Sequence, residues 1–99
     1  MTTRNELGMK ILYTSKFKKD YKRMKRQGRV VAKLTATLNM LAAGDPLPAR
    51  LRDHELAGDY LGHRECHVAP DWLLIYRIDR DRLILTAVRT GSHSELFGK

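Results

Sequence analysis

The sequence RECHVAPDWLLIYRIDRDRLILTAVR, residues 64–89, holds three short apolar runs separated by turn-forming residues. Apolar runs of this length, interrupted by proline or by paired charged residues, are typical of β-strands joined one after another in an antiparallel meander. We therefore predict strands over about Arg64–Val68, Trp72–Asp79 and Leu83–Arg89, with turns at Ala69-Pro70 and Arg80-Asp81.

Two helices and one more strand are predicted upstream of this meander. Apolar residues alternate with others over residues 9–13, which indicates a short strand. Apolar residues at helical spacing then indicate one helix from Ser15, its expected N-cap, to Gly28, and a second from about Val30 to Gly44. The proline-containing segment that follows, up to about Gly62, is predicted to be an irregular connection.

The element order β-α-α-β-β-β predicts an α+β fold. Because the connections are short, the two helices should form a hairpin that packs on one face of a small antiparallel sheet. A chain of 99 residues has the usual size of one domain, which we assign to residues 1–99. Residues 1–8 are expected to form a flexible or extended N-terminal segment.

The charge balance points to a polyanionic partner. Nineteen Lys and Arg against eleven Asp and Glu give a net charge of +8. A surplus of this size is typical of proteins that bind nucleic acid, an anionic membrane or an acidic protein. A merely soluble basic domain is the alternative that charge alone leaves open.

The sequence also favours one compartment, the cytoplasm. No apolar run approaches the roughly 20 residues that a membrane-spanning helix needs, and the polar N-terminus lacks the apolar stretch of a secretory signal. Cys66 is the single cysteine, so no internal disulfide can form, which suits a reducing environment. We expect Cys66 to pack in the core, and we expect no membrane association.

The first predicted helix is densely basic. Lys18, Lys22, Lys25 and Arg29 recur at helical spacing, with Lys19, Arg23 and Arg26 in a parallel row and only Asp20 to offset them. Like charges at these spacings mildly destabilise an isolated helix, so an external anion would relieve them. We predict that the first row contacts RNA phosphates, which positions a backbone but does not indicate catalysis. A solvated charged face is the alternative.

Histidines supply candidate acid–base chemistry. His54, His63, His67 and His93 all lie in the second half of the chain. Imidazole titrates near neutrality, so it can both accept and donate a proton at cellular pH. Cleavage of RNA needs both acts: removal of the proton from a ribose 2′-hydroxyl and protonation of the departing 5′-oxygen. Cationic side chains can stabilise the charge on the phosphate without a metal.

A metal site is the competing interpretation of these histidines. If His63 and His67 share a strand, they lie about 13 Å apart, which is too far for one ion. Cys66 would point to the opposite face from His67, because side chains alternate along a strand. We therefore predict no metal and no cofactor.

Three blocks of the sequence resemble the YafQ branch of the RelE toxin superfamily. They are DHELAG at residues 53–58, RECHVAPDWLLIY at 64–76 and RTGSHSELFG at 89–98. The resemblance implies a compact α/β fold and a ribosome-dependent endoribonuclease that cuts messenger RNA in the decoding site. It further implies contacts with 16S rRNA and silencing by a cognate antitoxin. The helix pair resembles the family only in pattern and charge.

The resemblance also assigns residues. The catalytic places fall on His54, His67, Asp71 and His93, while Trp72 and Phe97 border the RNA and Arg89 resembles a phosphate-stabilising arginine. By analogy His54 is the base and His93 the acid, with His67 and Asp71 orienting partners or substrate, although the sequence does not fix this order. His63 departs from the family pattern and is expected to be a rim residue.

Several of these residues also have plain structural interpretations. Asp71 could be a turn residue after Pro70, Trp72 could belong to the core, and Arg89 could pair with an acidic side chain. Two rival functions remain for the whole chain. One is a non-catalytic nucleic-acid-binding module, and the other is an inactive relative kept for its contact with an antitoxin.

Overall fold

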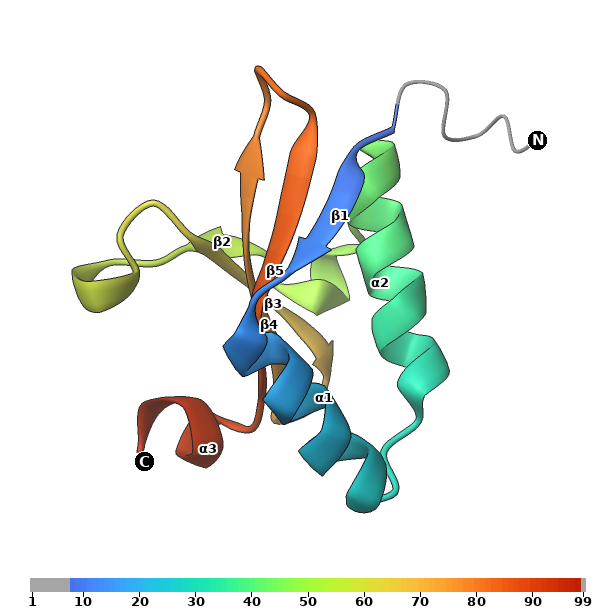
Figure 1. Ribbon diagram of the computed structural model, residues 1–99, viewed down its shortest axis with the longest axis vertical. Coiled ribbons are helices and arrows are strands. Elements are labelled where there is room, and N and C mark those ends of the chain that lie inside the picture. Colours follow the sequence, from blue (N-terminus) through green and yellow to red (C-terminus); the bar gives the residue numbers. More distant parts are fainter. Residues whose placement is uncertain (1–7, 99) are drawn as a thin grey trace.

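The computed structural model describes residues 8–98, so the predicted N-terminal segment, apart from Gly8, lies outside the described residues. Residues 8–98 contain strands, helices and two short 3₁₀ turns (Figure 1). The elements are β1 (Lys10–Tyr13), α1 (Ser15–Arg26), α2 (Val31–Ala43), η2 (Ala49–Leu51), β2 (His54–Glu55), η3 (Gly58–Tyr60), β3 (Arg64–Ala69), β4 (Trp72–Asp79), β5 (Ile84–Gly91) and α3 (His93–Phe97).

The strands form one five-stranded sheet in the order β1-β5-β4-β3-β2. The predicted antiparallel meander of β3, β4 and β5 is confirmed. The sheet is nevertheless mixed, because β1 pairs in parallel with β5, starting at Lys10 opposite Ile84. The alternating pattern of residues 9–13 indicated a strand but carried no information about its partner or direction.

Both predicted helices are present, with small differences at their ends. Thr14, and not Ser15, caps α1: its Oγ1 accepts a hydrogen bond from the Phe17 backbone N–H at 3.0 Å. The helix ends at Arg26, so Arg29 lies beyond it and does not extend the lysine row. Gly44 ends α2 as predicted, with φ of 77° in the left-handed region that glycine adopts readily.

The sheet separates two apolar clusters. On one face the helices α1 and α2 pack against strand residues, and Cys66 is fully buried there, as predicted. On the other face Leu73 and Ile75 pack against Leu96 of the short helix α3. The α+β class with a helix pair on one face is therefore confirmed. None of the helices in the described part of the chain is long and apolar enough to span a membrane.

Two elements that were not predicted position the site. The two-residue strand β2 lies inside the segment expected to be irregular and pairs with β3, with His54 opposite Glu65. The helix α3 begins with a capping box in which Ser92 and Glu95 bind each other's backbone N–H groups. With two and five residues, β2 and α3 are shorter than the stretches over which strand or helix periodicity can be recognised in a sequence.

Candidate active site

Three histidines from distant parts of the chain converge. His54 comes from β2, His67 from β3 and His93 from the first residue of α3. The His54 Nε2 atom lies 3.1 Å from Glu65 Oε2, and His67 Nε2 lies 3.9 Å from the same oxygen. The rings of His67 and His93 are 5.8 Å apart between centroids. The structure thus brings together the three imidazoles that the sequence analysis proposed as a unit.

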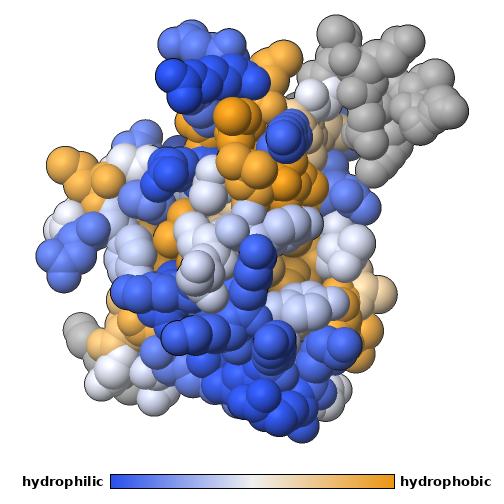
Figure 2. Space-filling model, in the orientation of Figure 1, coloured by the Kyte–Doolittle hydropathy of each residue, from blue (hydrophilic) through white to orange (hydrophobic). Residues whose placement is uncertain are grey.

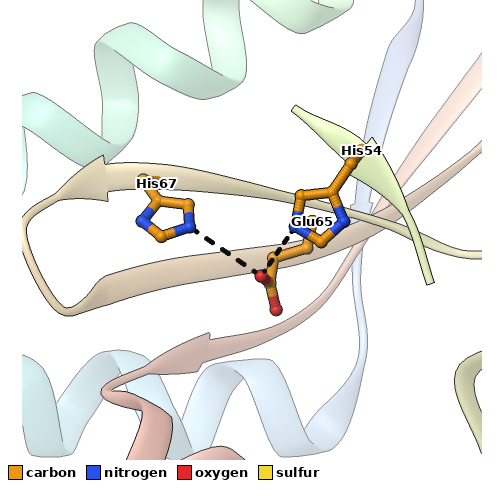
Figure 3. A group of neighbouring side chains, drawn as sticks. All are labelled: His54, Glu65 and His67. Atoms are coloured by element: carbon orange, nitrogen blue, oxygen red, sulfur yellow. Dashed lines mark hydrogen bonds and ion pairs between the residues drawn. The ribbon is translucent and has the colours of Figure 1, made fainter. Parts of the chain in front are cut away.

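Strand geometry explains half of this cluster. Glu65 and His67 are two residues apart on β3, so their side chains emerge on the same face of the sheet. His54 stands directly opposite Glu65 in the antiparallel ladder, where facing side chains are close neighbours. The carboxylate therefore lies between the two rings, as Figure 3 shows.

Asp71 and His93 form the other half. Asp71 occupies the turn between β3 and β4 with φ of 52°, a left-handed conformation that aspartate tolerates better than most residues. Its Oδ1 atom accepts the His93 backbone N–H at 2.9 Å and lies 2.8 Å from His93 Nδ1. The His93 backbone hydrogen bond and then the ring hydrogen bond hold the pKa of Asp71 below its ordinary value.

This pairing fixes which nitrogen of His93 is available. A carboxylate with a lowered pKa is ionised and can only accept hydrogen bonds, so His93 Nδ1 must carry the proton that Asp71 accepts. The Nε2 atom is then the one that can give or take a proton. Because the His93 side chain is half exposed, a substrate can reach it.

Glu65 is the site residue that the sequence analysis missed. It is only 5% exposed, and its Oε1 atom is buried without a hydrogen-bond partner among the described residues. Buried carboxylate oxygens normally have a hydrogen-bond partner, so an unpartnered oxygen beside two histidines marks a place where a ligand can bind. The available signal was the alternation itself, because an acid two residues before His67 must share its face.

Burial controls the protonation of His67. Burial lowers its pKa below the ordinary value of imidazole, the Glu65 carboxylate opposes this shift, and Arg52, His93 and His54 add to it. The net lowering keeps the His67 ring neutral at pH 7, so that it can accept a proton.

Replacing the two charged neighbours should shift the pKa of His67 in opposite directions. In Glu65→Gln the carboxylate that favours the imidazolium is lost, so the pKa of His67 falls further. In Arg52→Gln a repelling cation is lost, so the pKa rises. Proton NMR titration of the His67 ring measures both shifts, and the same direction of shift in both variants would contradict this electrostatic account.

A basic groove adjoins His67. It has a volume of about 550 Å³ and runs between α2, η2 and the end of β3. Its charged lining residues are all cations, Lys33, Arg50 and Arg52, and none of the three forms an ion pair within residues 8–98. These residues were not predicted, because Lys33 lies on α2 and the two arginines lie in and directly after η2, so no regular spacing links them in the sequence.

Arg89 pairs with an acidic side chain, which is the alternative interpretation given for it in the sequence. Its Nε atom forms an ion pair with Asp20 at 2.7 Å, and Asp20 is only 2% exposed. The pKa of Arg89 is raised chiefly by this hydrogen bond to Asp20. The predicted phosphate-stabilising arginine is thus already neutralised by a buried carboxylate.

Trp72 lies in the core, which is the alternative interpretation given for it in the sequence. It is 2% exposed within the helix-side core, and its indole N–H donates a hydrogen bond to Thr90 Oγ1 at 3.0 Å. The Arg29 guanidinium lies 5.4 Å from the centre of the ring. The indole therefore supports its neighbours and is not placed to stack on a base. Phe97 on α3, by contrast, is 37% exposed and packs edge-on against Tyr60, so a base can stack on its exposed surface.

The lysines of α1 belong to a different surface. Lys18, Lys22 and Lys25 are exposed and line a groove of about 510 Å³ between α1 and α2, whose walls include Phe17 and Leu34. Figure 2 shows hydrophilic side chains gathered over this helix. In the parallel row, Arg23 is paired with Asp20 and Glu95 and does not contribute a free charge.

One group of side chains has metal-ligand geometry. The nearest donor atoms of His54, Glu65 and His67 all lie within 4.8 Å of one another. Neither His63 nor Cys66 belongs to this group: the His63 ring packs edge-on against Tyr60, and Cys66 lies in the helix-side core. The spacing of His63, Cys66 and His67 excludes a site made of those three residues, but it does not bear on the group formed with Glu65 and His54.

Comparison with known proteins identifies the family. Residues 9–98 match the family described as bacterial toxin of type II toxin-antitoxin system, YafQ. The mRNA interferase toxin YafQ of Escherichia coli K12 is 40% identical over 89 residues, which cover 89% of this chain and 95% of the relative. The chain belongs to the YafQ toxin family. The resemblance read from three sequence blocks is confirmed, and it extends over the helix pair.

Solved structures of YafQ relatives share the fold. A metal-bound toxin from Helicobacter pylori is 40% identical with a TM-score of 0.84, covering 90% of this chain and 99% of that one. The toxin of the E. coli DinJ-YafQ toxin-antitoxin complex is 38% identical with a TM-score of 0.83, covering 92% and 99%. The fold class predicted from the sequence is therefore that of solved YafQ structures.

Proposed function

We propose that this chain is a toxin that cleaves messenger RNA on the ribosome by metal-independent acid–base catalysis. Its E. coli relative is named an mRNA interferase toxin. The observation that carries the proposal is the convergence of His54, His67 and His93 around buried Glu65, next to a groove lined by cations.

The reaction needs one proton acceptor and one proton donor. A base takes the proton from the ribose 2′-hydroxyl, and the 2′-oxygen attacks the adjacent phosphorus. The bond from phosphorus to the 5′-oxygen then breaks, and an acid protonates this oxygen. The products are a 2′,3′-cyclic phosphate and a 5′-hydroxyl end, with no oxidant, metal or water consumed.

We assign the acid to His93 and the base to His67. Asp71 holds His93 by Nδ1, which leaves Nε2 to deliver a proton to the leaving oxygen. His54 was the base expected by analogy, but both of its ring nitrogens face acceptors, the Glu55 carbonyl and the Glu65 carboxylate, each at 3.1 Å. The neutral ring of His67 is therefore the better acceptor, with His54 and Glu65 positioning it.

The basic groove supplies the charge that RNA requires. Arg52 lies close enough to lower the pKa of His67, and Lys33 and Arg50 continue the positive lining away from it. We infer that Arg52, in place of the paired Arg89, stabilises the charge that develops on the scissile phosphate. Phosphates of the neighbouring nucleotides then follow Lys33 and Arg50.

Removing one groove cation should weaken RNA binding in a salt-dependent way. Because each phosphate contact releases about 0.7 counterion from single-stranded RNA, Arg50→Gln should reduce the log–log slope of affinity against salt by about 0.7. The matched control is Arg82→Gln, since the Arg82 side chain is 79% exposed in the β4–β5 turn and does not line the groove. Fluorescence titration of a short RNA across a salt series makes the measurement, and equal slopes in both variants would argue against the groove.

We further propose that a cognate antitoxin silences the toxin. The E. coli relative is found in the DinJ-YafQ complex. The second groove, with apolar walls from Phe17 and Leu34 and a rim that includes Lys18, Lys22 and Lys25, suits an amphipathic acidic segment. The net charge of +8 would raise the rate of association with such a partner more than the affinity of the complex.

Expression of the chain alone in bacteria tests the proposal. Growth should stop, and new 5′-hydroxyl ends should map inside reading frames, with both effects suppressed by the antitoxin. In vitro, cleavage should require ribosomes and should survive removal of transition metals by a chelator that leaves Mg²⁺ in place. Equal cleavage of ribosome-free RNA would disprove ribosome dependence, and absence of cleavage in both settings would favour the inactive relative or the binding module.

A further inference from the structure

We propose that Glu95 is a positioning residue, which fixes the orientation of the His93 imidazole by tying the short helix α3 to α1. Its catalytic consequence rests on the proposed function, in which His93 is the acid. The orientation of the ring can be measured without any cleavage.

Helix α3 is too short to hold its own position. It spans five residues, His93–Phe97, whereas isolated helices shorter than about 12 residues are marginal in water. Leu96 anchors it to the sheet by packing on Leu73 and Ile75. A single apolar contact of this kind does not fix the rotation of the helix, so His93 at its start needs a further anchor.

Glu95 joins α3 to α1. Its Oε2 atom accepts a hydrogen bond from Gln27 Nε2 at 2.7 Å and lies 3.1 Å from Arg23 Nε. Arg23 lies in the last turn of α1, and Gln27 directly follows that helix. The Ser92 backbone N–H, and then Gln27 and Arg23, hold the pKa of Glu95 below its ordinary value, so the carboxylate is ionised at pH 7.

The other carboxylate oxygen fixes the backbone at the start of α3. Glu95 Oε1 accepts the Ser92 backbone N–H at 2.8 Å, and Ser92 Oγ accepts the Glu95 backbone N–H at 3.1 Å. This capping box sets the conformation of the residue directly before His93. The His93 backbone N–H then donates to Asp71 Oδ1, the same oxygen that lies 2.8 Å from the ring Nδ1. A continuous set of contacts therefore leads from α1 through Glu95 to the ring.

Close packing over Gly91, the last residue of β5, keeps this arrangement fixed. A Cβ atom at Gly91 would lie 2.7 Å from an Arg23 guanidinium nitrogen and 2.9 Å from Glu95 Oε1, so the ion pair closes directly over the backbone there. Arg23 is itself held by Asp20 and by the Thr90 carbonyl, at 3.0 and 3.1 Å. The pair thus differs from a mobile pair on an open surface, which fixes little.

A double-mutant cycle tests whether Glu95 acts through His93. Glu95→Ala should slow single-turnover cleavage by about 10- to 100-fold, because a misplacement of about 1 Å is enough for such a loss, while RNA affinity is largely kept. In a His93→Ala background the same substitution should cause no further loss, since the ring that it positions is absent. Ser94→Ala is the matched control, because Ser94 is exposed on the same helix and outside the capping box, and it should cleave like the parent chain.

NMR measures the orientation of the ring directly. Long-range ¹H–¹⁵N spectra, recorded at about pH 8.5 where an ordinary imidazole is neutral, report which ring nitrogen carries the proton. We expect the proton on Nδ1 of His93 in the parent chain and in Ser94→Ala, and exchange between both nitrogens in Glu95→Ala. Gln27→Ala removes one contact of the carboxylate at an exposed position, so it should shift the balance in the same direction by less. This variant keeps the test valid if Glu95→Ala fails to fold.

Three results would overturn the inference. They are undiminished cleavage in Glu95→Ala, an equal loss of rate with and without His93, which would reveal a merely structural role, and a His93 proton that stays on Nδ1 in both Glu95→Ala and Gln27→Ala. Failure of the proposed function looks different: the parent chain does not cleave, or His93→Ala cleaves as fast as the parent. The NMR result then decides the role of Glu95 alone.

Discussion

His93→Ala should reduce messenger RNA cleavage by roughly 10²–10⁴-fold, the usual contribution of one proton-transfer group. Asp71 Oδ1 accepts the His93 backbone N–H at 2.9 Å and lies 2.8 Å from the ring Nδ1, so the ring is oriented with Nε2 available before substrate binds. The backbone N–H contact survives the substitution. The side chain is half exposed, so the loss should fall on the rate and not on the fold.

The measurement is single-turnover cleavage of messenger RNA on purified ribosomes, with RNA binding recorded in parallel. His63→Ala is the control, since its ring lies beside Tyr60 and outside the cluster. It should cleave within a few-fold of the parent chain. If His93→Ala cleaves as fast as His63→Ala, the role of His93 as acid is wrong. If the parent chain binds RNA and never cleaves, the non-catalytic module or the inactive relative is favoured.

The fold was predictable where apolar periodicity is long enough to read. β4 and β5 span eight residues each, and α1 and α2 span twelve and thirteen, so their patterns are clear in the sequence. The parallel pairing of β1 with β5 was not predictable, because backbone hydrogen bonds leave no mark on side-chain order. β2, with two residues, has no pattern at all.

The sequence predicted which residues form the site, but not how deeply each is buried or which residues it contacts. The resemblance selected His54, His67, Asp71 and His93, and these converge in the structure. Glu65 was missed because the sequence does not show whether an acidic side chain is buried or exposed. The partners of Arg89 and Trp72 could not be ranked either, since Asp20 and Thr90 lie 69 and 18 residues away along the chain.

Asp20→Asn should lower the free energy of unfolding by about 3 kcal/mol, near the lower end for removing one partner of a buried ion pair. Asp20 is 2% exposed and accepts hydrogen bonds from Arg89, Arg23 and the Thr90 backbone N–H. An amide of the same shape keeps the packing but presents one acceptor in place of two. It leaves Arg89, whose side chain is 18% exposed, without a counter-charge.

Urea unfolding measures the change, and an unaltered dependence on urea would show that only the native state is affected. Asp79→Asn is the matched control, because Asp79 pairs with Arg82 at 3.9 Å where both side chains are well exposed, and its effect should stay below about 0.5 kcal/mol. The two carboxylates differ in burial and in the number of hydrogen bonds that they accept. If Asp20→Asn is as mild as its control, the link from α1 to β5 lies elsewhere, and Arg89 is free to serve the phosphate after all.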